Sequence, residues 1–185
     1  MYRYIADLHI GCTNSFEHRT LEHDEILVKN WNSVVNNNDT TFILGDIGRC
    51  GNNKDNEYLC SVISRLKSKK ILVVGNHDES GLKDYRVKQL FETVVDYFEL
   101  TDNYNGINQK LVLSHYPIAH WYNQYRGAVH LYGHVHNTKD YQAFLQYAQI
   151  CKNLAIPFES YNVGCMLYYM DYTPRTLDEI RRSAK

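Results

Sequence analysis

The stretch from Ile71 to Asp78, which reads Ile-Leu-Val-Val-Gly-Asn-His-Asp, constrains the fold more than any other part of the chain. Its four apolar residues, three of them β-branched, predict a fully buried strand, and Gly75 allows a tight turn where that strand ends. An amide, an imidazole and a carboxylate follow directly. Because open α/β sheets bind ligands outside the carboxyl ends of their strands, the stretch predicts a parallel sheet with a polar site at one edge. Taken alone, the same polar residues would be an ordinary surface turn.

The first half of the chain predicts a βαβαβ unit. Buried strands are expected at 2–7 and 41–44 as well as at 71–74, and apolar residues at helical spacing predict helices around 26–35 and 59–66. Alternating strands and helices of this kind build a parallel sheet. The remainder predicts a short helix at 84–91, a turn at Asn105-Gly106, a helix from 138 to about 154, a final helix after the capping box 176–179, and strands at 93–100, 110–115, 128–132 and 161–169.

Composition places the chain among ordinary globular proteins. Its 185 residues are 44% hydrophobic and 22% charged, so we expect one domain over residues 1–185 with a sizeable core. A net charge of -1 lacks the basic footprint of a protein that binds long nucleic acid or an anionic membrane.

Cysteine usage and hydropathy indicate a cytoplasmic protein. The five cysteines are odd in number and have no C-x-x-C spacing, which favours reduced, mostly buried thiols. No leader sequence is apparent before the first strand, and no apolar run approaches the roughly 20 residues of a membrane-spanning helix.

Metal-ligand side chains follow five of the predicted strands. Carboxylate, imidazole and amide groups suit borderline first-row metals, and no thiolate is among them. In chain order the candidates are Asp7, His9, Asp46, Asn76, His115, His134 and His136. A catalytic zinc ion typically uses about three protein ligands. Two ions that share a bridging carboxylate accommodate the larger set, and such pairs catalyse in-line displacement at phosphorus. Singly, any of these residues could be a turn or capping residue.

The order of these blocks resembles the calcineurin-like metallophosphoesterase family. The blocks are Asp-x-His, Gly-Asp, Gly-Asn-His-Asp, Ser-His and Gly-His-x-His, and they extend from Asp7 to His136. The resemblance implies a four-layer α/β/β/α sandwich of two mixed sheets with flanking helices. It also implies a phosphoester hydrolase with two divalent metal ions (Mn²⁺, Fe²⁺/Fe³⁺ or Zn²⁺) and a bridging hydroxide as the nucleophile. The compact chain, with no insertion to build a lid, favours a phosphodiesterase like the small bacterial or phage members.

The resemblance implies a role for each metal-binding position. The first ion would be held by Asp7, His9 and His136. The second would be held by Asn76, His115 and His134, and Asp46 would bridge both.

The resemblance further implies that His77 binds no metal. It would stabilise the phosphoryl oxygens and protonate the leaving oxygen, while Asp78 would lie behind it and orient the imidazole. Asn162, at the start of the last predicted strand, could support the site from behind.

Segment 116–126 is expected to form a wall beside the metals. Trp121, Tyr122 and Tyr125 could stack on a base or an aromatic leaving group, and Arg126 could reach phosphate, as could Arg49 near the rim. Alternatively, the aromatic residues pack the segment onto the body of the protein, and Arg49 is a plain surface charge.

Two other functions remain open. A nucleotide or dinucleoside polyphosphate hydrolase would use the same ions, and Trp121→Ala would then raise KM for nucleotides. A non-catalytic scaffold would retain the fold without the reaction. The expected partner is a small phosphoester or nucleotide, with no membrane and no long nucleic acid, and the sequence does not indicate an oligomeric state.

Overall fold

The structure of the chain is a computed structural model that describes residues 1–13, 20–104 and 106–184. Its first sheet has the order β1-β2-β3-β4 and is parallel throughout. The strands are β1 (Tyr2–Ile5), β2 (Thr40–Ile43), β3 (Lys69–Val73) and β4 (Thr93–Val95), and the connecting helices are α1 (Glu22–Val34) and α2 (Asn53–Ile63). The predicted βαβαβ unit is confirmed. Beyond β1, an isolated bridge between Tyr4 and Arg175 adds one antiparallel pair to this otherwise parallel sheet.

The second sheet has the order β5-β6-β7-β8 and is mixed, because β5 runs antiparallel to β6 while β7 and β8 continue in parallel. Its strands are β5 (Tyr97–Tyr104), β6 (Ile107–Ser114), β7 (Val129–Tyr132) and β8 (Ser160–Asn162). The shorter helical elements are α3 (Glu79–Leu82), α4 (Tyr85–Lys88) and the 3-10 turn η1 (Gln124–Arg126), and the later helices are α5 (Lys139–Asn153) and α6 (Leu177–Ser183).

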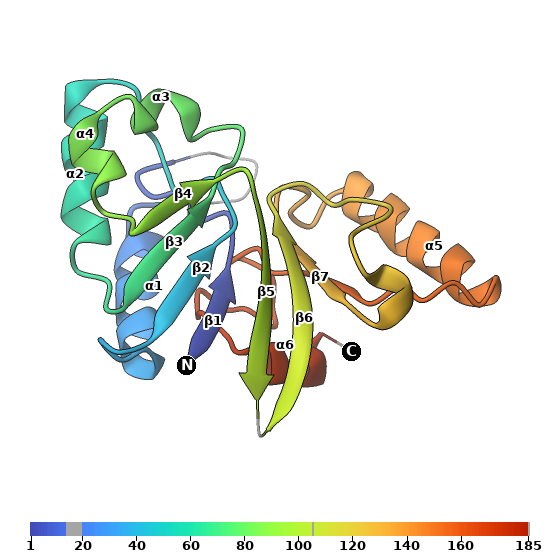
Figure 1. Cartoon of the computed structure of the whole chain (residues 1–185). Helices are drawn as coiled ribbons and strands as arrows, with labels where there is room; N and C mark the ends of the chain where they lie inside the picture. The colour runs from blue at the N-terminus through green and yellow to red at the C-terminus, as the bar shows by residue number, and fades with distance from the viewer. Residues whose placement is uncertain (14–19, 105, 185) are drawn as a thin grey trace.

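Helices flank the pair of sheets, as the family resemblance implies. Figure 1 shows α1, α2 and α4 beside the first sheet and α5 on the far side of the second. The two sheets meet through aromatic rings: Phe42 of β2 stacks on Tyr4 with ring centroids 5.5 Å apart and contacts Phe98 of β5 at the same centroid distance. The predicted α/β/β/α architecture is therefore confirmed. No helix in the described part of the chain is long and apolar enough to cross a membrane.

Two predicted strands differ from the structure. The run 93–100 is broken at Asp96, so that β4 belongs to the first sheet and β5 to the second. Local alternation of side chains cannot reveal a change of sheet, because each half keeps its own strand pattern. The strand expected at 161–169 is limited to β8, and the chain then turns with positive φ at Asp171 and Tyr172.

The helix predictions differ mainly in length. The helix expected at 84–91 is limited to the single turn of α4, whereas α5 is confirmed. The capping box of α6 is also confirmed, since Thr176 N–H donates to Glu179 Oε2 at 2.8 Å and Glu179 N–H donates to Thr176 Oγ1 at 3.3 Å. Of the predicted Asn105-Gly106 turn, Asn105 lies outside the described residues.

Candidate metal centre

The strands β1, β2 and β3 end along one edge of the first sheet (Figure 1). Most of the side chains predicted to bind metal lie close together. The ligand atoms form two groups. Within each group, all the ligand atoms lie within 4.8 Å of one another. One group is Asp7, His9, Asp46 and His136, and the other is Asp46, His115 and His134. Asn76 adjoins the second group, with Oδ1 at 2.9 Å from His115 Nε2. Each group could hold a metal ion, and Asp46 belongs to both.

The spacing of the donor atoms fits a cation. His9 Nε2 lies 3.2 Å from His136 Nε2 and 3.9 Å from Asp46 Oδ2, while His115 Nε2 lies 3.5 Å from the same carboxylate oxygen. Imidazole nitrogens and carboxylate oxygens converge here without a thiolate, which is the donor set that suits Mn²⁺, Fe²⁺ and Zn²⁺.

Strained backbone coincides with these residues. Among the candidate ligands, φ is 57° at Asp7, 45° at His9, 55° at Asp46, 70° at His134 and 45° at His136. A left-handed conformation costs a non-glycine residue about 1–2 kcal/mol and persists where the surroundings enforce it, which is common at functional sites. Half of the ten non-glycine residues with positive φ in the described chain are candidate ligands, so the strain is concentrated at this edge.

Glycines let the ligand turns approach closely. A Cβ at Gly45, where φ is 82°, would lie 2.4 Å from His115 Nδ1 and 2.6 Å from Gly75 Cα. A Cβ at Gly75 would lie 2.4 Å from Asp46 Oδ1. Either side chain would displace a candidate ligand, which explains why each of these polar blocks begins with glycine.

His115 is oriented for ligation. Its Nδ1 is 2.8 Å from the carbonyl oxygen of Leu44, and donation of that N–H leaves the Nε2 lone pair for a cation. Burial lowers the pKa of His115 and of His134, against the opposing effect of Asp46. The neutral imidazole, which is the form that binds metal, is thereby favoured.

Two further contacts hold the last ligand block. The Asp7 carboxylate accepts a hydrogen bond from His134 N–H at 3.0 Å. The buried Asn162 amide donates to the carbonyl oxygen of His136 at 3.1 Å, and its Oδ1 accepts from Gly164 N–H. The support from behind that Asn162 was expected to provide is therefore directed at the His136 backbone.

Asp78 has a different role from the one implied by the resemblance. Its fully buried carboxylate accepts hydrogen bonds from the backbone N–H groups of Gly75, Asp46 and Ile47 at 2.8, 2.9 and 2.8 Å. Burial raises the pKa of Asp78 to about 6, although the three amides oppose the shift. The carboxylate braces two ligand turns against each other instead of orienting the His77 imidazole, and the expected role is corrected accordingly.

His77 is exposed beside the first group. Its ring centroid lies 5.9 Å from that of His9, and its backbone N–H donates to Asp46 Oδ1 at 3.0 Å. An adjoining cleft of about 370 Å³ is lined by His9, Arg49, Asn76, His77 and Ser80, together with two cysteines and a glycine. Arg49 lines the same cleft as His77, and its Nε pairs with Asp55 Oδ2 at 3.0 Å.

Trp121 does not line the site. The side chain is 7% exposed, its Nε1–H donates to the carbonyl oxygen of Ala128 at 2.8 Å, and its ring contacts His130 and Phe158. The prediction that Trp121 stacks on substrate is wrong, and the alternative, that it packs the segment onto the body, is confirmed for this residue.

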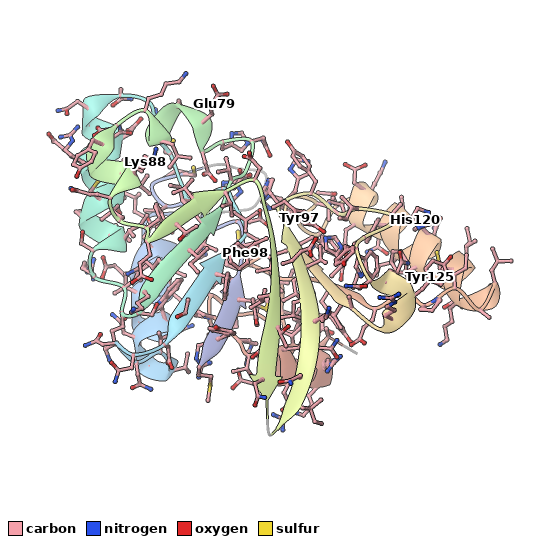
Figure 2. All side chains as sticks on the ribbon, viewed as in Figure 1. Glu79, Lys88, Tyr97, Phe98, His120 and Tyr125 are labelled. Carbon is pink, nitrogen blue, oxygen red and sulfur yellow. The ribbon has the colours of Figure 1, made fainter. Side chains whose placement is uncertain are left out.

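The end of the same segment lies by α5. Figure 2 shows His120 and Tyr125 on that side, and His120 Nε2 is 3.5 Å from the hydroxyl of Tyr147 in α5. The exposed Arg126 side chain makes no hydrogen bond or ion pair with another described residue. The structure therefore brings Tyr125 and Arg126 into no contact with the candidate ligands that it describes.

Tyr116 is a residue that the sequence reasoning missed. Its ring centroid lies 4.4 Å from that of His134 and 5.1 Å from that of His115, and the side chain is 48% exposed. Its position directly after the Ser-His block is the signal that could have identified it.

Comparison with known proteins assigns the fold and the site to a class. Residues 4–148 match the calcineurin-like phosphoesterase family, and the chain belongs to this family. Family membership and the two ligand groups together indicate a metal-dependent phosphoesterase.

Particular relatives come from phages and an archaeon. The Gene 66 protein of Mycobacterium phage L5 is 42% identical over 80 residues, which span 40% of this chain but only 38% of that protein. The Gene 66 protein of Mycobacterium phage D29 is 28% identical over 72% of this chain and 77% of its own. The uncharacterized protein MJ1445 of Methanocaldococcus jannaschii is 26% identical over 85% and 82%. The solved structure of AQ665 from Aquifex aeolicus, a protein of unknown function, is 25% identical, covers 98% of both chains and has a TM-score of 0.69.

Proposed function

We propose that this protein is a dinuclear phosphodiesterase that acts on small phosphodiesters. The observation that carries the proposal is the Asp46 carboxylate, which lies in both groups of metal-binding side chains. When bound, two neighbouring divalent ions supply Lewis acidity and activate a water for attack on phosphorus. The five free cysteines support a reducing, cytoplasmic setting.

The proposed ligand assignment follows the two groups. Asp7, His9 and His136 would hold one ion, and Asp46 belongs to both groups. His115, His134 and the Asn76 amide oxygen would hold the other ion. Mn²⁺, Fe²⁺/Fe³⁺ and Zn²⁺ all suit these nitrogen and oxygen donors.

His77 is the proposed general acid. Its exposed ring lies next to His9 at the mouth of the cleft, and its backbone is tied to Asp46. From this place the imidazolium donates a proton to the leaving oxygen as the phosphorus–oxygen bond breaks.

Arg49 is the proposed phosphate contact. Because Asp55 engages its Nε, the two terminal nitrogens of the guanidinium remain to form a bidentate pair with a phosphoryl group. The cleft of about 370 Å³ beside His77 also has room for an esterified group, which supports a diester over a monoester.

The test compares hydrolysis of bis(p-nitrophenyl) phosphate and p-nitrophenyl phosphate by metal-stripped protein, with and without Mn²⁺, Fe²⁺ or Zn²⁺. We expect metal-dependent cleavage that favours the diester, vanishes in Asp46→Asn and falls about 10²-fold or more in His77→Ala. Preference for the monoester would contradict the diester assignment. No hydrolysis with any metal would indicate a scaffold instead.

A further inference from the structure

The reaction proposed above assigns no role to Tyr116. Its ring contacts the imidazoles of both His115 and His134, with interplanar angles of 74° and 60°. Because the ring is tilted against both imidazoles and half of the side chain is exposed, part of its aromatic surface faces solvent at the rim of the metal centre.

The backbone of Tyr116 is held firmly although its ring is exposed. The Ser114 hydroxyl donates to the carbonyl oxygen of Tyr116 at 2.7 Å and lies 2.8 Å from Nε2 of the buried His130. Pro117 follows directly and restricts the chain. No described residue hydrogen-bonds the Tyr116 hydroxyl. An aromatic ring that is positioned in advance loses little entropy when it stacks on a ligand.

Tyr116 and His77 contact different candidate ligands. His77 shares its cleft with His9 and Asn76, whereas Tyr116 contacts His115 and His134. A general acid in the cleft protonates the leaving group there. The ester group that stays on phosphorus has no assigned contact in this scheme, and the exposed ring of Tyr116 at the rim of the centre can supply one.

We propose that Tyr116 determines substrate specificity by stacking on a flat ring in the retained ester group, so that the preferred substrates are nucleoside or aryl phosphodiesters. This inference rests on the proposed function for the reaction itself. In the reaction, water adds to phosphorus, the bond from phosphorus to the leaving oxygen breaks with a proton supplied by His77, and the stacked product is a monoester.

The test uses two diesters with the same leaving group, thymidine 5′-(p-nitrophenyl) phosphate and methyl p-nitrophenyl phosphate, and Mn²⁺-loaded protein. In Tyr116→Ala we expect KM for the thymidine ester to rise about 10-fold or more, as for loss of one base-stacking contact, and kinetics with the methyl ester to change less than about 2-fold. Tyr116→Phe should retain the preference because the ring is unchanged. The matched control is Tyr125→Ala, an exposed tyrosine of the same segment, which should alter neither substrate.

A binding measurement makes the inference independent of turnover. By calorimetry, Tyr116→Ala should bind thymidine 5′-monophosphate about 10-fold more weakly than the unaltered Mn²⁺-loaded protein, with equal metal content. An unchanged Kd, or equal losses with the thymidine and methyl esters, would overturn the role of Tyr116. Absence of hydrolysis with either ester would instead count against the proposed function, while the binding result would still decide the inference.

Discussion

The turns after β1, β2 and β3 and the segment 116–126, of which Tyr116 contacts two candidate ligands, are held by different forces. In the turns, buried polar groups tie backbone to backbone, as the Asp78 carboxylate does for Gly75, Asp46 and Ile47. In the segment, one large ring, Trp121, is buried against the outer face of the second sheet. The turns therefore direct their polar side chains to the centre, whereas the segment divides its aromatic residues between core and solvent.

This difference shows what kind of residue pattern predicts a site. The side chains of a short polar block after a buried strand have one main direction, because the edge of the sheet sets where the chain emerges. An aromatic-rich segment has two directions, and the gain from burying a Trp side chain competes with any contact to a ligand.

The largest effect on hydrolysis is expected at the carboxylate that both ligand groups share. Asp46→Asn removes the negative charge between the two ligand groups, so we expect Mn²⁺-dependent hydrolysis to fall at least about 10³-fold. Steady-state kinetics and metal content measure the effect. Asp96→Asn, at an exposed break between strands, is the control and should leave both unchanged. Retained activity in Asp46→Asn would remove the basis for a dinuclear centre.

The matching change in the segment should affect stability instead of specificity. Trp121→Ala removes a buried ring and its hydrogen bond to Ala128, and should lower the free energy of unfolding by about 3–5 kcal/mol. Urea denaturation measures this loss, with Tyr122→Ala, an exposed neighbour, changing it by less than about 0.5 kcal/mol. If Trp121→Ala instead raised KM for nucleotides only and left the free energy of unfolding unchanged, Trp121 would be part of the substrate site.

A smaller effect is expected where the two turns are braced. In Asp78→Asn, at least one of the three backbone N–H groups loses its acceptor, which should cost about 1–3 kcal/mol of unfolding free energy and weaken Mn²⁺ binding. Urea denaturation and metal titration measure both quantities. The neighbouring Glu79→Gln alters only an exposed pair with Lys83 and should be close to neutral. If Asp78→Asn changed only the pH profile of hydrolysis, Asp78 would act through His77 after all.

An effect of comparable size concerns the histidine whose ring contacts Trp121. Burial lowers the pKa of His130 to about 3, from roughly 6.5 in the unfolded chain. Between these values the unfolded state binds the extra proton, so His130 contributes stability that is complete above about pH 6.5 and is lost as the pH falls. At pH 5 the loss is about 2 kcal/mol.

Comparison with His130→Gln isolates this contribution. Both proteins are compared without metal, and their other titratable groups are the same. Between pH 7 and pH 5 the free energy of unfolding of the variant should therefore fall by about 2 kcal/mol less than that of the unaltered chain. Urea denaturation at both pH values measures the difference. Equal losses would mean that His130 is solvated or paired when charged.

Much of the fold could be predicted because its signals are local. The βαβαβ unit follows from apolar periodicity, and α6 begins where its capping box predicts. The break at Asp96 could not be predicted, because the exchange of one sheet for the other depends on pairing with residues far away in the chain. The same limit applies to 161–169, where β-like composition forms turns after β8.

The order of the polar blocks predicted the family, and their places directly after buried strands predicted which residues meet at the centre, because the carboxyl ends of parallel strands share an edge. Tertiary structure decided the direction of the side chains around that set. Asp78 turns to backbone amides, Trp121 turns inward and Tyr116 remains at the rim. Such directions depend on which groups elsewhere in the chain compete for the same surface, and neighbours in sequence carry no record of that competition.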